Sequence, residues 1–435
     1  MSDSDTLRLV EYEEREVALS PADAAYLARV FAGQIALRRA LVGEGYLLNP
    51  NQFVGVLVLP SGRRLEIAPK VPVRSLLFML AVAAELPSPF LEEAAEFAEL
   101  DELLEFVAAA FADLAEERIA RGLYRAYVER EENLAAVRGR IAVTADLRHN
   151  LVLRHRTFCR FAEFTEDVPE NRVVRQVAHL LARWVRRPAL RLRLWRIDQV
   201  LGSVAPAQFP AEAIDRFVYG RLNEGYRPLH RLCALVLRWS SFAEGSGPFA
   251  FRAFLLDMNR LFEAFVTQVL RDHAPPSVSV DDQVRLHLGQ GRRVDIRPDI
   301  VVRVGSVPLL VADCKYKRVE PDGFKQHDVY QMLAYCTALG LDRGLLVYPK
   351  HAVPVDDEIA VVNSPVRIRQ RSLDLSGSLP ELKAACRALA DELLTGASPT
   401  DPRIAETSAL PVPDPAPASA SGHRPSAHGM GVGSG

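Results

Sequence analysis

Residues 293–317 read RVDIRPDIVVRVGSVPLLVADCKYK. Two runs rich in Val, Ile and Leu flank the turn at Gly305-Ser306, which predicts two neighbouring strands of one sheet. Side chains alternate along a strand, so Asp313 and Lys315 share one face of the second strand. Asp299 lies in the first strand. We therefore expect Asp299, Asp313 and Lys315 to meet at one end of a sheet.

These three side chains suit metal-assisted hydrolysis of a phosphodiester. The carboxylates of Asp299 and Asp313 can hold Mg²⁺, a hard cation that prefers oxygen ligands and keeps several waters. The metal polarises the phosphate and lowers the pKa of a bound water, while Lys315 orients that water or stabilises the developing charge. The alternative is a solvated ion pair between Asp313 and Lys315 on an edge strand. We favour the catalytic interpretation because the strand is apolar, and unused charges in such a strand are costly.

The order of the motifs resembles the core of the PD-(D/E)xK nuclease superfamily. Pro298-Asp299 followed by Asp313-x-Lys315 supplies its two acids and its lysine. The resemblance implies that Asp299 and Asp313 ligate the metal and that Lys315 positions or activates water.

Two helical motifs extend this resemblance. Gln331-x-x-x-Tyr335 is similar to the QxxxY motif of the RecB-like branch, and the two residues share one helical face. Glu263, on an upstream amphipathic helix, matches the helical acid that precedes the core. The resemblance implies that Glu263 completes the acidic set and that Gln331 and Tyr335 orient the site or contact DNA. From the residues alone, Glu263 would equally suit a surface charge, and Tyr335 would equally suit the core.

Several upstream stretches resemble one family that carries this nuclease core. They are VLVLPSGRRLEIAPK at 56–70, LLFML at 76–80, RGRI at 138–141, FCRFAEF at 158–164 and EDVPENR at 166–172. With the nuclease motifs they resemble the McrC family, the nuclease subunits of McrBC-type modification-dependent restriction systems, over most of residues 50–350.

The family resemblance implies a metal-dependent DNA endonuclease that works with a separate AAA+ GTPase of McrB type. In such systems the partner recognises modified DNA and translocates, and the N-terminal part of the nuclease subunit docks on the ring and stimulates GTP hydrolysis. Arg63, Arg64 and Lys70 are candidates for this stimulation, although we favour the interpretation that they belong to an ordinary hairpin surface. The chain has no GxxxxGK[ST] motif, so we expect it to bind no nucleotide itself.

Composition limits the other functional classes. The chain has 435 residues, of which 49% are hydrophobic, and a net charge of −2, so DNA binding must come from local basic patches. Its five cysteines contain no CxxC pair, which argues against a zinc site or a disulfide framework. We expect a cytoplasmic protein, because the chain shows neither a signal peptide nor an apolar run of membrane-spanning length.

One stretch is locally basic. Its arginines are Arg172, Arg175, Arg183, Arg186, Arg187, Arg191, Arg193 and Arg196. They suit either a contact with the DNA backbone or a solvated helical face offset by neighbouring acids.

We expect an α/β fold in which a PD-(D/E)xK nuclease core, a mixed sheet flanked by helices, follows an N-terminal α+β region with a β-hairpin and a helical middle. The expected parts are a partner-docking region at 1–122, a strand and helix region at 123–245, the nuclease domain at 246–395 and a disordered tail at 396–435. The tail is rich in Pro, Ala, Ser and Gly and has few large apolar residues to offset the entropy of ordering.

Within these parts, the pattern predicts a first strand over 7–19, a β-hairpin over 53–68, and a pair of strands at 122–134 and 138–141.

Two alternatives remain open from the sequence. The chain would also fit a stand-alone RecB-like nuclease, or a GTPase activator whose nuclease core is inactive. The intact set of two acids and a lysine argues against the second of these.

Overall fold

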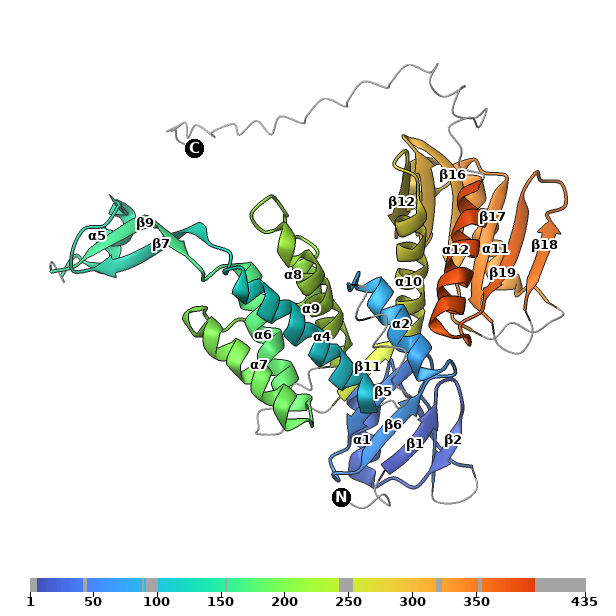
Figure 1. Ribbon diagram of the computed structural model, residues 1–435, viewed down its shortest axis with the longest axis horizontal. Coiled ribbons are helices and arrows are strands. Elements are labelled where there is room, and N and C mark those ends of the chain that lie inside the picture. The colour runs from blue at the N-terminus through green and yellow to red at the C-terminus, as the bar shows by residue number, and fades with distance from the viewer. Residues whose placement is uncertain are drawn as a thin grey trace, which may run out of the picture.

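The computed structural model describes residues 6–41, 45–87, 90, 101–152, 155–241, 253–317, 323–350 and 354–395, and it has a mixed α/β architecture (Figure 1). The expected disordered tail at 396–435 lies outside the described residues. No helix in the described part of the chain is long and apolar enough to cross a membrane.

The N-terminal unit is built on a sheet with the strand order β1-β6-β5-β11-β10. These strands are β1 (Thr6–Val10), β6 (Arg64–Ala68), β5 (Phe53–Val58), β11 (Ala253–Asp257) and β10 (Ser240–Ser241). The antiparallel pair β5 and β6 is the hairpin expected from the sequence. Gly55 allows β11 to approach β5, because a Cβ there would overlap the carbonyl of Phe254.

A smaller sheet and one helix complete this unit. They are β2 (Arg15–Val17), β4 (Tyr46–Asn49), β3 (Ala36–Arg39) and α1 (Pro21–Val30). The expectation of one strand over 7–19 is wrong, because Tyr12 has a φ of 58° and turns the chain, so that β1 and β2 join different sheets. The helix α1 begins where Ser20 accepts a hydrogen bond from the backbone N–H of Asp23, which satisfies one of its free N-terminal donors.

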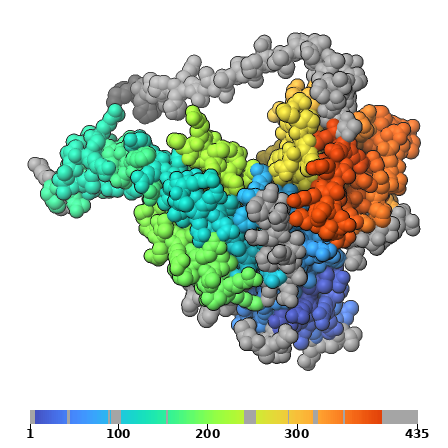
Figure 2. All heavy atoms as spheres, in the orientation of Figure 1, coloured from blue at the N-terminus to red at the C-terminus, as the bar shows by residue number. Residues whose placement is uncertain are grey.

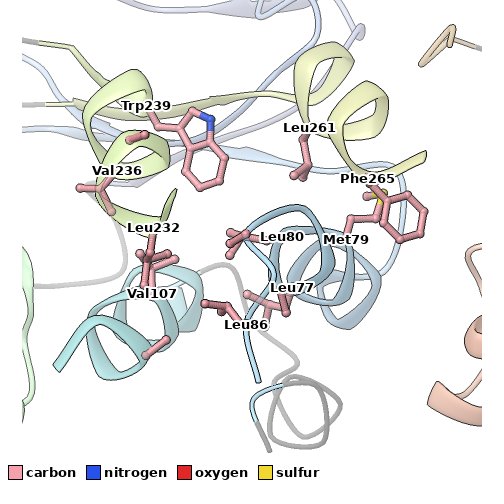
Figure 3. Packing of buried hydrophobic residues seen from close by; sticks show 14 of the residues in the cluster. Leu77, Met79, Leu80, Leu86, Val107, Leu232, Val236, Trp239, Leu261 and Phe265 are labelled. Carbon is pink, nitrogen blue, oxygen red and sulfur yellow. The ribbon is translucent and has the colours of Figure 1, made fainter. Parts of the chain in front are cut away.

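Helices form the middle of the molecule. They are α2 (Val73–Ala83), α4 (Asp101–Ala120), α6 (Pro169–Trp184), α7 (Pro188–Val200), α8 (Ala211–Ile214) and α9 (Arg227–Trp239), with short 3₁₀ turns η2 (Leu201–Ser203) and η3 (Glu224–Tyr226). Figure 3 shows Leu80 of α2, Val107 of α4 and Leu232 of α9 meeting at the centre of this layer. The same apolar cluster continues through Leu261 and Phe265 into the C-terminal sheet, so one core joins the parts.

An arm stands away from this helical layer (Figures 1 and 2). It consists of β7 (Ala126–Leu134), β8 (Arg140–Ile141), α5 (Val143–His149) and β9 (Thr157–Thr165). The sequence pattern predicted that the first two strands pair with each other, but the strand order is β7-β9-β8, so each pairs with β9 instead. We call residues 126–165 the arm.

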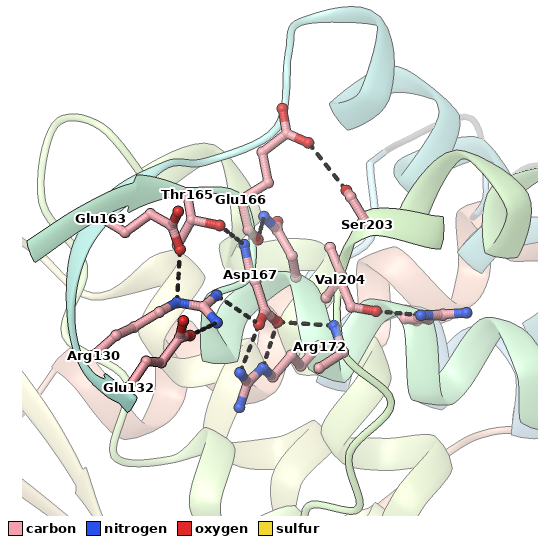
Figure 4. A network of polar contacts seen from close by, with 12 residues as sticks. Arg130, Glu132, Glu163, Thr165, Glu166, Asp167, Arg172, Ser203 and Val204 are labelled. Atoms are coloured by element: carbon pink, nitrogen blue, oxygen red, sulfur yellow. Dashed lines mark hydrogen bonds and ion pairs between the residues drawn. The ribbon is translucent and has the colours of Figure 1, made fainter. Parts of the chain in front are cut away.

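The base of the arm is fixed to the helices by Asp167 (Figure 4). Its carboxylate accepts two hydrogen bonds from Arg172, at 2.7 and 2.9 Å, and one from the backbone N–H of Ala205 at 2.8 Å. Arg130 of β7 reaches the same carboxylate at 3.4 Å. The hydrogen bonds from Arg172 come first among the causes that lower the pKa of Asp167 to about 2.

The C-terminal unit has a mixed sheet with the order β12-β15-β16-β17-β19-β18. Its strands are β12 (Val278–Asp282), β15 (Ile300–Val304), β16 (Val307–Cys314), β17 (Arg343–Pro349), β19 (Arg367–Leu373) and β18 (Asp356–Ala360). The strands β15 and β16 form the expected antiparallel pair, whereas β16, β17 and β19 run parallel.

Helices cover both faces of this sheet, as parallel strands require. They are α10 (Met258–His273) and α12 (Leu379–Thr395) on one face and α11 (Gln326–Leu339) on the other. A small insertion lies between β12 and β15. It consists of a two-stranded sheet, β13 (Leu286–Leu288) with β14 (Val294–Ile296), and the turn η4 (Gln290–Arg292). The strand β11 belongs to the N-terminal sheet, so that sheet reaches past the boundary expected at residue 246.

Candidate active site

The first acid of the candidate site comes from α10. This helix begins at Asp257, whose side chain accepts hydrogen bonds from the backbone N–H groups of Asn259 and Arg260. Leu261 and Phe262 are buried in the core, which fixes the helix against the sheet. Glu263 follows and is half-buried, with its carboxylate accepting a hydrogen bond from the side chain of Gln283.

Asp299 stands at the start of β15, after the buried Pro298. One of its carboxylate oxygens accepts a hydrogen bond from the backbone N–H of Cys314 at 2.8 Å, which ties it to the end of β16. The other accepts a hydrogen bond from the side chain of Gln283 at 3.1 Å. Gln283 thus contacts both Glu263 and Asp299, and it brings the helix and the strand together.

The end of β16 carries the remaining acid and the lysine. Asp313 is 2% exposed, and its carboxylate lies 2.5 Å from the ammonium nitrogen of Lys315. The backbone N–H of Lys315 donates to the carbonyl of Val347 on β17 at 2.8 Å, so the lysine extends the parallel pairing. The pair lies inside the sheet rather than on an edge strand, since β15 and β17 flank β16.

The helix α11 closes the site from the other side. Lys315 donates a hydrogen bond to the side-chain oxygen of Gln331 at 3.0 Å, and the Gln331 amide donates to the Tyr335 hydroxyl at 2.6 Å. The Tyr335 hydroxyl donates to the carbonyl of Arg297 at 3.0 Å, two residues before Asp299. Tyr335 is 3% exposed and belongs to the apolar cluster on this face, so the residue is part of the core and of the polar chain.

Burial and mutual repulsion raise the pKa values of the acids. Burial comes first and the Glu263 carboxylate second among the causes that raise the pKa of Asp299 to about 6. Burial and then Asp299 raise the pKa of Asp313 to about 7, against the opposing effect of Lys315. Burial also raises the pKa of Glu263. Burial alone would lower the pKa of Lys315, but the Asp313 carboxylate outweighs it and leaves that pKa raised.

The donor set fits a hard divalent cation. Three carboxylates concentrate negative charge, and a cation between Asp299 and Asp313 would relieve the repulsion that raises their pKa values. Within the described ranges, no group of three or more His, Cys, Asp and Glu side chains is arranged to hold a metal by itself. Mg²⁺ needs no such cage, because it is commonly held by one or two carboxylates together with waters and phosphate oxygens.

A contact from the N-terminal unit reaches the residue next to Lys315. The Tyr316 hydroxyl donates to the carboxylate of Glu11 at 2.8 Å, and the backbone N–H of Lys70 donates to the same oxygen at 2.6 Å. Glu11 is fully buried, and burial raises its pKa to about 7. The Tyr12 hydroxyl also donates to the carbonyl of Tyr316, at 3.0 Å. The N-terminal unit therefore fixes the chain where it leaves the candidate site.

Sequence reasoning did not identify Gln283 or Glu11. Gln283 has a φ of 51° at the end of β12, and its partners are 16 and 20 residues away in sequence. Glu11 meets Tyr316 across 305 residues. No local spacing marks either residue, because the contacts of Gln283 depend on how α10 packs against the C-terminal sheet and the contact of Glu11 depends on how the two units pack.

Other candidates from the sequence lie apart from this site. Arg63 donates to the carbonyl of Ala18, Arg64 forms an ion pair with Glu66, and the Lys70 ammonium lies 4.8 Å from the ring centre of Tyr12. In the arginine-rich stretch, several side chains are paired with acids, as the solvated-face alternative expected. These pairs are Arg172 with Asp167, Arg175 with Asp198, and Arg193 with Asp113 and Glu116.

The fold is similar to that of a solved assembly. One similar chain belongs to a structure described as a half-complex from a tetradecameric assembly of Thermococcus gammatolerans McrB AAA+ hexamers with bound McrC. The two chains align with a TM-score of 0.52 and 19% identity, and the alignment covers 88% of this chain and 100% of that one. A chain in a cryo-EM structure of the Thermococcus gammatolerans McrBC complex aligns with a TM-score of 0.40 and 21% identity, covering 61% of this chain and 87% of the other. No curated protein matches the sequence.

A family model matches most of the chain. It describes a McrBC 5-methylcytosine restriction system component, and it covers residues 48–349. The matched range includes the arm and the acids and lysine of the candidate site, and it confirms the family resemblance inferred from the motifs. The chain belongs to the family of McrBC 5-methylcytosine restriction system components.

Proposed function

We propose that this chain is a Mg²⁺-dependent DNA endonuclease subunit of a McrBC-type restriction system. The observation that carries the proposal is the convergence of Glu263, Asp299, Asp313 and Lys315 at one end of a sheet, where Gln283 bridges two of the carboxylates and the third pairs with the ammonium group. This arrangement corresponds to the acid and lysine positions of the PD-(D/E)xK core. A structural ion pair would need only Asp313 and Lys315, and would leave the other two acids unexplained.

Each residue has a distinct role in this proposal. Asp299 and Asp313 would hold Mg²⁺, which polarises the scissile phosphate and lowers the pKa of a bound water. Lys315 orients that water or stabilises charge that develops on the phosphate, since its ammonium group is held between Asp313 and Gln331. Gln331 and Tyr335 position Lys315 through their hydrogen bonds, and Glu263 adds negative charge beside Asp299.

The partner in this proposal is an AAA+ GTPase of McrB type, and we place its docking on the arm rather than on residues 1–122, where the sequence led us to expect it. The arm carries a concentration of exposed apolar side chains: Tyr127, Val137, Ile141, Val143, Leu147, Leu151, Val152 and Phe164. Its strands and α5 also line a hollow of about 940 Å³. Exposed apolar side chains gathered on a projecting element are typical of a protein-binding surface. The arm has more exposed apolar side chains than the hairpin that carries Arg63 and Arg64.

The test is DNA cleavage in Mg²⁺ by the full chain, alone and together with the McrB-type GTPase and GTP. The proposal predicts cleavage that requires the partner and GTP, and stimulation of GTP hydrolysis by this chain. Cleavage by the chain alone would favour a stand-alone nuclease. Stimulated GTP hydrolysis without any cleavage would make the chain an activator and would remove the catalytic role from the site. The double variant Val143→Asp/Leu147→Asp, on exposed arm positions, should abolish both partner-dependent activities.

A further inference from the structure

A short hairpin begins and ends at the candidate active site. Residues 284–297 contain β13 and β14, and they lie between Gln283 and Asp299. The backbone N–H of Gln283 donates to the carbonyl of Asp299 at 2.9 Å, which closes the base of the hairpin. Whatever binds the hairpin near its base is therefore next to the acids.

The two faces of the hairpin differ in character. Its register pairs Leu286 with Ile296, and Ile296 packs on the apolar cluster that includes α11 residues. Because side chains alternate along a strand, Arg285 and Arg297 lie on the opposite face, and Arg293 directly precedes β14. All three are exposed. The hairpin therefore has one face for the core and one basic face for solvent.

The basic face has more positive charge than its own acids balance. Continuing the register by one residue sets Arg285 opposite Arg297, and like charges directly opposite each other destabilise a strand pair. The acid on this face, Asp295, lies 2.7 Å from His287. Of the residues that the structure describes, none forms an ion pair with Arg285 or Arg293. An anion on this face would relieve the repulsion between the arginines.

We infer that the basic face of this hairpin binds phosphates of the DNA backbone beside the bond to be cut. Guanidinium groups present planar pairs of donors that match phosphate oxygens. Arg297 donates to the carbonyl of Gln283 at 3.1 Å, and the side chain of Gln283 contacts Asp299 and Glu263. A DNA strand held by these arginines thus lies close to the acids, to which Arg297 is linked through Gln283. The inference rests on the proposed nuclease function and adds its substrate-binding surface.

The test compares three double variants of the full chain in binding to a short DNA duplex in EDTA, where no cleavage occurs. Arg285→Gln/Arg293→Gln removes two charges from the hairpin and spares Arg297, whose hydrogen bond supports the base. Arg285→Lys/Arg293→Lys keeps the charges. Lys383→Ala/Arg387→Ala removes the same charge from exposed positions on α12, which covers the other face of the sheet.

Each phosphate contact contributes about 0.9 to the slope of log affinity against log salt. The Gln variant should reduce that slope by roughly 1.8 and weaken binding at 0.1 M salt by on the order of tenfold for each arginine. The Lys variant should keep most of the slope, and the α12 variant should keep all of it. Circular dichroism confirms that each variant is folded.

Three results overturn the inference. If the Gln variant has the slope of the wild type while the wild type still cuts DNA in Mg²⁺ with partner and GTP, the hairpin inference fails and the proposed function stands. If the α12 variant loses as much slope as the Gln variant, the effect is one of total charge and the hairpin is not a site. If the wild type neither binds nor cuts DNA, both proposals fail.

Discussion

At the scale of single residues, the candidate site is a place where buried carboxylates repel one another. Asp313 is nearly inaccessible, and burial and Asp299 raise its pKa to about 7, whereas an ordinary aspartate has a pKa near 3.8. The ionised form is therefore unfavourable in the metal-free fold. The stability that neutral Asp313 contributes to the fold is fully present below about pH 4 and is lost as the pH rises through about 7. A bound divalent cation would reverse this dependence.

The variant Asp313→Asn tests this account, because asparagine stays neutral at every pH. In EDTA at pH 8 we expect its free energy of unfolding to exceed that of the wild type by about 1 to 3 kcal/mol. The difference should shrink toward pH 5, and Mg²⁺ should stabilise the wild type at pH 8 but not the variant. Urea unfolding at the two pH values, with and without Mg²⁺, measures this. A variant that is less stable than the wild type in EDTA at pH 8 would contradict the charge repulsion.

At the scale of elements, the strand and helix that carry the motifs were largely predictable, whereas the contacts that orient them were not. The alternation around Asp313 and Lys315 predicted the strand, and the four-residue spacing of Gln331 and Tyr335 predicted one helical face. Gln283 escaped prediction, because a left-handed glutamine after a strand carries no motif and acts through tertiary contacts.

The arm shows the same division between local and tertiary information. Its strands follow from the sequence pattern, but β8 is only two residues long and pairs with β9 instead of with β7. That choice depends on the return of the chain through α5, which short-range alternation does not record.

Asp167 at the base of the arm gives a prediction at this scale. Its pKa is lowered to about 2, so its contribution to stability is present above about pH 4 and is lost as the pH falls through 2. Asp167→Asn should cost about 2 kcal/mol at pH 7, since it removes the charge that Arg172 and Arg130 share. Glu132→Gln is the control, because Glu132 is exposed and lies 3.8 Å from Arg130, and it should cost less than about 0.5 kcal/mol. If urea unfolding shows that both variants lose the same free energy of unfolding, the contacts of Asp167 are worth no more than an ordinary surface ion pair.

At the scale of the whole molecule, an apolar core and the polar contact of Tyr316 with Glu11 are among the links that join the N-terminal unit to the C-terminal unit. The polar contact matters for the site because Tyr316 directly follows Lys315 and donates to the buried Glu11. The unit that carries β1 and β6 thus holds the end of the strand from which Asp313 and Lys315 project. Sequence alone could not reveal this, since Glu11 belongs to an acidic stretch that is typical of solvated surface.

Tyr316→Phe removes only the hydroxyl of this contact. It leaves the Glu11 carboxylate with one hydrogen bond fewer in a buried position, which should cost about 1 to 3 kcal/mol of stability. We also expect cleavage to slow several-fold while DNA affinity in EDTA is unchanged, because the substitution moves Lys315 and not the proposed DNA-binding face of the hairpin at residues 284–297. Tyr330→Phe, on an exposed position of α11, is the control and should change neither. A loss of stability with unchanged cleavage would limit the contact to a structural role.

The proposed nuclease function requires Lys315 to be a catalytic group rather than half of a structural ion pair. The most direct measurement is the rate of DNA cleavage in Mg²⁺, with partner and GTP, by the wild type, Lys315→Ala and Lys350→Ala. Lys350 is a matched control, because it lies 2.6 Å from Asp374 in the same unit, with a side chain 28% exposed against 20% for Lys315. A catalytic role for Lys315 predicts that Lys315→Ala lowers the rate at least a hundredfold, with unchanged DNA affinity, and that Lys350→Ala cuts at the wild-type rate. Cleavage by Lys315→Ala at the rate of Lys350→Ala would contradict it.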